Sequence, residues 1–249
     1  DRSQLRLRFD DTVEVATVLR YASWIERRKL GEPVAYIVGR QGFWTLELAV
    51  DTAVLIPRAD TETLVEWAIS LIEASFPRRR ESSSASPYVL DLGTGSGAIA
   101  LAIASERADA RVTATDVSDA ALDVARENAR LNAVSNVELL RSSWFDALPK
   151  SPLPPGEGWV RDSAQTERSI APDSLIPSPS PAGRGETSAL FDLIVSNPPY
   201  IAVGDAHLSA LRYEPRLALT SGPDGLDAIR EIIRDAPMHL KAGGWPLLE

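Results

Sequence analysis

Hydrophobic and polar residues alternate along the central part of the chain with two different periods. Short apolar runs typical of buried strands are separated by segments with the spacing of amphipathic helices. The expected strands are Tyr88 to Leu92, Arg111 to Thr115, Val137 to Arg141 and Phe191 to Val195, and the expected helices between the first three end at Glu106 and Leu131. This alternation predicts an α/β fold with a mainly parallel sheet flanked by crossover helices.

The residues before this region predict a helix and a β-hairpin. Residues 12–30 have an amphipathic pattern that stops at Gly31. Apolar residues alternate with polar ones over residues 44–50, which predicts a half-buried strand, with Val54-Leu55-Ile56 as its hairpin partner. Helical spacing resumes after Asp60 or Thr61, either of which could be the N-cap.

These patterns predict three parts. We expect residues 1–40 to be the remnant of a helical domain, because one helix cannot bury its own apolar face, and residues 41–76 to be a hairpin and a helix leading into the main domain. Residues 77–249 would form that domain. Residues 151–188 hold seven of the 18 prolines together with many Gly and Ser, which predicts a disordered insertion, with a proline-rich ligand for a partner domain as the alternative.

Composition narrows the classes of function. The 249 residues carry 35 acidic and 26 basic side chains, a net charge of −9, which disfavours broad binding of nucleic acid. The absence of cysteine excludes disulfides and thiolate zinc sites, and His207 and His239 lie far apart without a carboxylate cluster, so we expect no metal site. No apolar run is long enough to cross a membrane, and we expect a cytoplasmic monomer.

A glycine-rich loop, Gly93-Thr94-Gly95-Ser96-Gly97, follows the first strand of the sheet. Glycines allow the backbone to turn tightly and to approach a ligand at the carboxyl end of a strand, beside a helix N-terminus. This loop alone is compatible with NAD or with S-adenosylmethionine, and a purely structural turn is a weaker alternative.

Two further segments indicate a nucleoside. Asp116 ends the next strand, where its carboxylate can accept hydrogen bonds from both ribose hydroxyls, while Ser118 is the better candidate for the following helix N-cap. Trp144 and Phe145 offer a flat face for adenine, although aromatic residues in such loops often serve packing alone.

The segment Asn197-Pro198-Pro199-Tyr200 follows the fourth expected strand and indicates the chemistry. Two prolines make a stiff turn, which leaves the Asn197 side-chain oxygen and the Pro198 carbonyl free to accept hydrogen bonds from one NH2 group. Such a grip would orient a weakly nucleophilic nitrogen toward a methyl donor without a general base. Tyr200 can pack on the planar group. A simple Pro-Pro turn is the structural alternative.

Together these motifs resemble the protein-(glutamine-N5) methyltransferases that modify peptide chain release factors. The similarity lies in residues 31–39, residues 55–62, residues 91–97, Asp116, residues 197–200 and residues 243–245. It implies a class I methyltransferase (Rossmann-like) fold and transfer of a methyl group from S-adenosylmethionine to the glutamine of a Gly-Gly-Gln motif in a release factor.

The resemblance also implies roles for individual residues. The implied cofactor contacts are Asp91, Gly93, Thr94, Gly95, Ser96, Gly97, Asp116, Trp144 and Asn197. The implied substrate contacts are Asn197, Pro198, Pro199, Tyr200 and Arg58, with Phe43 helping to close the site; Asn197, Pro198 and Tyr200 would be catalytic.

Several alternatives stay open. A ribosomal-protein glutamine methyltransferase is the nearest, and residues 31–39 favour release factors over it. Adenine-N6 nucleic-acid methyltransferases use the same tetrapeptide, but the net charge argues against them. A cofactor-binding module without activity is the alternative outside the enzymes. Compared with the family pattern we expect truncation at both ends, and Pro246 is awkward within the last strand because it lacks an N–H.

Overall fold

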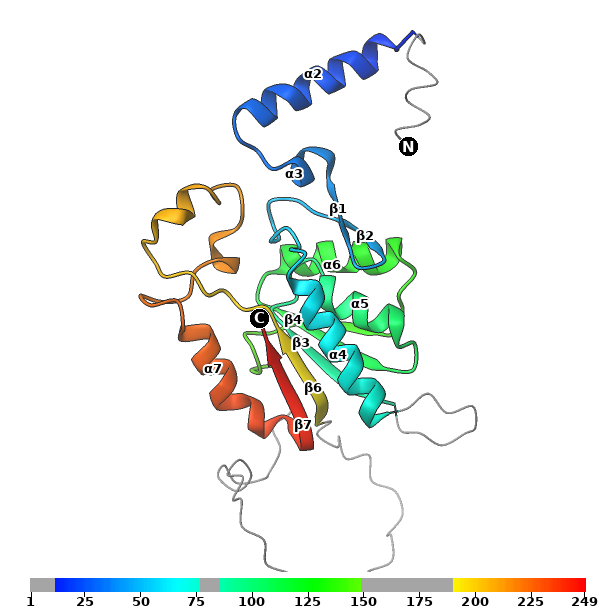
Figure 1. Cartoon of the computed structure of the whole chain (residues 1–249), viewed down its shortest axis with the longest axis vertical. Helices are drawn as coiled ribbons and strands as arrows, with labels where there is room; N and C mark the ends of the chain where they lie inside the picture. The colour runs from blue at the N-terminus through cyan, green and yellow to red at the C-terminus, as the bar shows by residue number, and fades with distance from the viewer. Residues whose placement is uncertain (1–11, 77–85, 149–189) are drawn as a thin grey trace, which may run out of the picture.

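The computed structural model describes residues 12–76, 86–148 and 190–249. A parallel sheet lies at the centre with helices on both faces, and the N-terminal helix and the hairpin lie beyond the carboxyl ends of its strands (Figure 1). The expected linker around residues 78–86 falls almost entirely outside the described residues, and the expected insertion at 151–188 lies wholly outside them. Of the helices within the described ranges, none is both long and apolar enough to cross a membrane.

The sheet has five strands in the order β5-β4-β3-β6-β7, and all neighbours are parallel. The strands are β3 Tyr88–Leu92, β4 Arg111–Asp116, β5 Val137–Arg141, β6 Phe191–Ser196 and β7 Leu240–Leu248. The prediction of a parallel sheet and of its first four strands is confirmed. The strand order reverses between β3 and β6, and a crevice for ligands is expected at such a switch point.

Alternate residues of the strands face two layers of helices. On one face, Val89 and Val195 pack with α4 Thr61–Ser75 and α5 Ala98–Glu106. On the other face, Leu90 and Ile194 pack with α7 Asp227–Asp235. The helix α6 Asp119–Leu131 packs against β4, β5 and the hairpin. The period of two in the strands therefore builds a core on each side of the sheet.

Pro246 is compatible with this sheet. It pairs with Ile194, and β7 is an edge strand of the described sheet. A proline is tolerated on an edge strand because one side of the strand has no neighbour to receive a ladder hydrogen bond.

The N-terminal part contains α2 Val15–Lys29, α3 Val34–Val38, β1 Arg40–Phe43 and β2 Leu46–Ala49. The prediction of a helix within residues 12–30 is confirmed. None of the residues of α2 is buried. The hairpin exists, but its predicted pairing was wrong: β1, rather than residues 54–56, pairs with β2. The reversal occurs at Trp44, whose φ is 55°, before the alternating strand instead of after it.

Residues 54–56 serve packing instead of pairing. Val54 and Ile56 are buried in a small cluster with Tyr36 of α3. The Tyr36 hydroxyl donates a hydrogen bond to the Val54 carbonyl at 2.6 Å, and burial raises the pKa of this hydroxyl. The apolar run was therefore identified correctly as buried, but a period of two cannot distinguish a strand from an extended segment that packs against a helix.

Candidate active site

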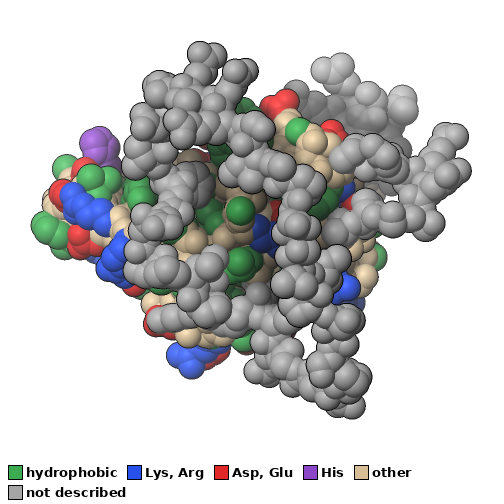
Figure 2. All heavy atoms as spheres, turned by 90° about the horizontal axis from the view of Figure 1, so that it is seen from below, with side chains coloured by type: hydrophobic (Ala, Val, Ile, Leu, Met, Phe, Trp, Pro, Cys, Tyr) green, Lys and Arg blue, Asp and Glu red, His purple; other side chains and the backbone are tan. Residues whose placement is uncertain are grey.

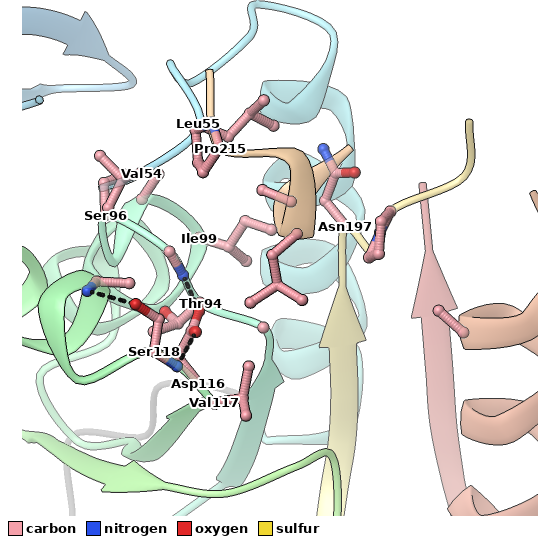
Figure 3. Close-up of a pocket in the computed structure, with 18 of the residues that line it drawn as sticks. Val54, Leu55, Thr94, Ser96, Ile99, Asp116, Val117, Ser118, Asn197 and Pro215 are labelled. Carbon is pink, nitrogen blue, oxygen red and sulfur yellow. Dashed lines mark hydrogen bonds between the residues drawn. The ribbon is translucent and has the colours of Figure 1, made fainter. Parts of the chain in front are cut away.

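A cavity of about 430 Å³ lies at the carboxyl edge of the sheet, in the size range of small-molecule sites. We call one side the inner wall, contributed by residues 93–96, 116–118 and 142–144 and by Asn197. The opposite side is the outer wall, contributed by residues 53–58 and 215–221. Figure 3 shows Leu55 and Pro215, one from each segment of the outer wall, on the same side of the cavity.

The glycine loop takes a conformation that requires glycine. Gly93, Gly95 and Gly97 have φ angles of 69°, 57° and 83°. A Cβ on Gly97 would lie 3.0 Å from a methyl carbon of Leu101, whereas a Cβ on Gly95 would meet nothing within 4 Å. The loop therefore packs tightly against α5 on one side and leaves space for a ligand on the other.

Asp91 holds this loop from behind. It is fully buried, and one carboxylate oxygen accepts hydrogen bonds from the Thr94 hydroxyl at 2.6 Å and the Ala100 N–H at 3.2 Å. Burial raises its pKa to about 7, against the lowering effect of these two hydrogen bonds. Neither Asp91 nor Gly97 is among the cavity-lining residues, so both act on the cavity through the loop.

Asp116 lies where β4 ends and faces the cavity (Figure 3). Its two carboxylate oxygens accept hydrogen bonds from the Gly95 N–H and the Ser118 N–H, both at 2.9 Å. Ser118 accepts the Ala121 N–H and is the N-cap of α6, as predicted. A carboxylate has about four acceptor positions, so Asp116 retains acceptors for two hydroxyls of a ligand.

The two aromatic residues after β5 lie in different environments. Trp144 lines the cavity, and its ring approaches within 3.5 Å of the position that a Cβ of Gly93 would take. Phe145 is only 4% exposed and stacks on His239 with 4.5 Å between ring centroids. The interpretation of Phe145 as an adenine platform was wrong, because this ring is buried in the core on the α7 side of the sheet.

Asn197 lines the cavity at the end of β6 (Figure 3). Its amide nitrogen donates hydrogen bonds to the Thr61 hydroxyl at 3.2 Å and to Glu249 Oε2 at 2.8 Å. Because both N–H groups are engaged, Oδ1 is the atom that Asn197 presents to a ligand. Sequence reasoning missed these roles of Thr61 and Glu249, since it considered Thr61 only as a helix cap.

The rest of the tetrapeptide is only partly in the cavity. Pro199 lines it, Pro198 is buried, and Tyr200 is 53% exposed and is not a lining residue. The turn is supported from outside, since a Cβ on Gly225 would lie 2.3 Å from the Tyr200 carbonyl oxygen. Contact of Tyr200 with a substrate stays a prediction.

Arg58 lines the outer wall and forms an ion pair with Glu214 at 2.5 Å. Phe43 of the hairpin strand β1 is buried and does not line the cavity. Sequence reasoning missed Glu214, for which the sequence alone offered no signal. In the described ranges, no group of three or more His, Asp or Glu side chains could hold a metal ion.

Asn128 of α6 connects the hairpin to the glycine loop. It is fully buried, and its amide nitrogen donates to the Ala49 carbonyl at 3.0 Å and the Ser96 carbonyl at 2.8 Å. Its Oδ1 accepts the Ala49 N–H at 2.6 Å. One satisfied amide therefore fixes the distance between the hairpin and the loop, and sequence reasoning missed this residue too.

Several known protein families and structures are similar to this chain. Two family models match the chain, one described as "Methyltransferase domain" over residues 84–157 and one described as "PrmC N-terminal domain" over residues 1–39. The chain thus contains a methyltransferase domain. Among solved structures, the human methyltransferase 10 domain containing protein is similar with a TM-score of 0.48 and 16% identity, over 92% of this chain and 79% of that one.

Curated relatives match over most of their length. A release factor glutamine methyltransferase of Xylella fastidiosa strain Temecula1 is 44% identical over all of this chain and 74% of the relative. The proteins of the same name from Burkholderia pseudomallei and Pseudomonas aeruginosa are 42% and 44% identical, over 100% and 92% of this chain and 73% and 67% of their own.

Proposed function

The chain belongs to the family of release factor glutamine methyltransferases. We propose that it transfers a methyl group from S-adenosylmethionine to a release factor. The acceptor is the side-chain amide nitrogen of the glutamine in the Gly-Gly-Gln motif. The observation that carries the proposal is the orientation of Asn197. Its nitrogen is engaged by Thr61 and Glu249, and its oxygen is the acceptor that it offers at the cavity.

The inner wall fits the proposed cofactor. Asp116 has acceptors for ribose hydroxyls, the open side of Gly95 allows close approach, and the Trp144 ring can cover an adenine. The cavity lining also carries three carboxylates, Asp116, Asp227 and Glu231, against the one guanidinium of Arg58, and this negative balance favours a cationic ligand. Bound there, S-adenosylmethionine supplies a methyl group whose bond to the positively charged sulfur breaks with its electron pair left on sulfur.

The tetrapeptide would position the acceptor nitrogen. An amide nitrogen is a poor nucleophile because its lone pair is delocalised into the carbonyl group. Asn197 Oδ1 and the Pro198 carbonyl would accept its two N–H bonds, hold it facing the methyl group and stabilise the positive charge that develops on it. Thr61 and Glu249 keep Oδ1 in place, because rotating the Asn197 amide would break both of their hydrogen bonds.

Charge argues against the nucleic-acid alternative. The chain has a net charge of −9. Figure 2 shows one face of the molecule, on which acidic, basic and hydrophobic side chains are interspersed wherever described residues are visible. An adenine-N6 methyltransferase would have to attract phosphates, and the net negative charge of the chain does not favour this. The proposed substrate belongs to translation, which locates the enzyme in the cytoplasm.

The direct test is mass spectrometry of a release factor incubated with the enzyme and S-adenosylmethionine. We expect one added methyl group on the glutamine of the Gly-Gly-Gln motif and none on a release factor in which that glutamine is replaced by alanine. Methylation at another residue, or of an RNA offered in parallel, would contradict the proposal. Cofactor binding by calorimetry without any methylation would support a binding module instead.

A further inference from the structure

Glu214 lies between the two segments of the outer wall. Its side chain is only 4% exposed, and Oε1 accepts a hydrogen bond from the Arg58 guanidinium at 2.5 Å. The other oxygen, Oε2, accepts the Ile56 backbone N–H at 3.2 Å. One carboxylate thus holds both the backbone and a side chain of residues 53–58.

The neighbours of Glu214 build the opposite segment. Pro215 follows it directly and lines the cavity. Tyr213 precedes it, packs beside the cluster of Tyr36 and Ile56, and donates a hydrogen bond from its hydroxyl to the Leu30 carbonyl at 3.0 Å. The chain before Glu214 is therefore anchored by Tyr213, and a change at this carboxylate would reach the cavity wall through Pro215.

Arg58 is the group whose direction depends on Glu214 most. It lines the cavity, and its side chain is 39% exposed. Asp116 and Asp227 line the same cavity. Without Glu214, the guanidinium would be attracted toward these carboxylates and into the space that a ligand needs.

We propose that Glu214 is a positioning residue for the methyl transfer, an inference that rests on the proposed function. It locks residues 53–58 against residues 215–221 and keeps the Arg58 guanidinium in the outer wall. Glu214 acts through Arg58 and Ile56, and its carboxylate is directed at these two groups instead of at the reacting atoms.

Hydrogen exchange measures this lock without any activity. In Glu214→Ala the Ile56 amide should exchange about tenfold faster and those of Val54, Leu55 and Arg58 should follow, because the bonds to the Ile56 N–H and the Arg58 side chain are lost, while β3 and β4 keep their protection. Glu214→Gln keeps one acceptor and should show a smaller increase. The matched control is Glu127→Gln, which also removes a carboxylate paired with an arginine, but on the exposed face of α6. Unchanged exchange at residues 54–58 in Glu214→Ala overturns the proposal.

Steady-state kinetics test the consequence for catalysis. We expect Glu214→Gln to lower kcat with the release factor roughly 10- to 100-fold, because a small misplacement of the wall disturbs the reacting geometry. The KM for S-adenosylmethionine should change less than about threefold, since its proposed contacts on the inner wall are untouched. A purely structural role would instead weaken cofactor binding and lower Tm together.

A double-mutant cycle identifies the route. If Glu214 acts largely through Arg58, Glu214→Gln should cost little more in a chain that already carries Arg58→Gln. Fully additive effects would contradict this route. Glu214→Asp shortens the side chain but keeps the carboxylate, so its effect should fall between wild type and Glu214→Gln. The kinetics use Glu214→Asp if Glu214→Gln does not fold. Failure of the wild type to methylate a release factor refutes the proposed function, while hydrogen exchange still decides the role of Glu214.

Discussion

The inner and outer walls of the cavity are built by different means. The inner wall continues directly from the parallel strands, and its loop is tied to the sheet by the backbone hydrogen bond from the Thr94 N–H to the Thr115 carbonyl at 2.8 Å. The outer wall lies outside the named strands: a short backbone bridge to Ile201 holds residues 215–221, whereas single side chains such as Glu214 and Tyr36 hold residues 53–58. Backbone bonds to the sheet support the inner wall, whereas residues 53–58 depend on a few side chains, so that one substitution can loosen this part of the outer wall.

The largest expected effect concerns the inner wall. Asn197→Ala should lower the methylation rate roughly 100- to 1,000-fold, because it removes one of the two acceptors that would hold the substrate nitrogen. Cofactor affinity, measured by calorimetry, should change far less. Asn132→Ala at the exposed end of α6 is the control and should keep full activity. A fully active Asn197→Ala would show that the cavity does not use this side chain.

Asn128→Ala should break the link between the hairpin and the glycine loop. It leaves the Ala49 N–H, the Ala49 carbonyl and the Ser96 carbonyl without their buried partner. We expect a loss of about 2–4 kcal/mol in the free energy of unfolding, measured in urea. The control Asn132→Ala removes bonds to the exposed Glu47 carbonyl and the half-buried Asn128 carbonyl, and it should cost clearly less because neither bond is fully buried. Equal losses would mean that the hairpin is not held through Asn128.

The buried Asp91 should make the stability of the protein fall as the pH rises towards neutrality. Burial raises its pKa from 3.8 to about 7, so the folded state binds its proton more tightly than the unfolded state. The stabilisation is therefore complete below about pH 4 and is lost as the pH rises through about 7. The variant Asp91→Asn has no side chain at this position that titrates in this pH range.

The test compares the two proteins at both ends of this range. Between about pH 4 and pH 8, the stability of wild type relative to Asp91→Asn should fall by on the order of 4 kcal/mol. Urea unfolding at several pH values measures this difference, and other carboxylates contribute equally to both proteins. Parallel pH profiles would show that Asp91 stays ionised inside the loop.

The smallest expected effect concerns the outer wall. Tyr36→Phe removes the buried hydroxyl that donates to the Val54 carbonyl, and it should cost about 1 kcal/mol. Exchange of the amides around Val54 should rise while the glycine loop stays protected. The matched control is Tyr21→Phe on the exposed α2, which should leave stability unchanged. Faster exchange throughout both walls would remove the distinction between them.

The residue pattern alone predicted the parallel sheet, the glycine loop, Asp116 at the end of β4 and Asn197 at the end of β6. These features are local: apolar periods mark strands, and parallel strands bring their carboxyl ends to one edge. The same local signals misplaced the hairpin pairing and treated Phe145 as equivalent to Trp144, because periodicity reports burial and not the partner.

The tertiary structure was needed to show how the side chains of the site are held in place. Asn197 is oriented by Thr61 and Glu249, which lie 136 and 52 residues away, and Arg58 is held by Glu214, 156 residues away. Such bonds depend on the direction of single side chains across folded segments, which no spacing in one sequence records. The chemistry was therefore readable from strand ends, while the geometry that makes it work comes from polar contacts between distant segments.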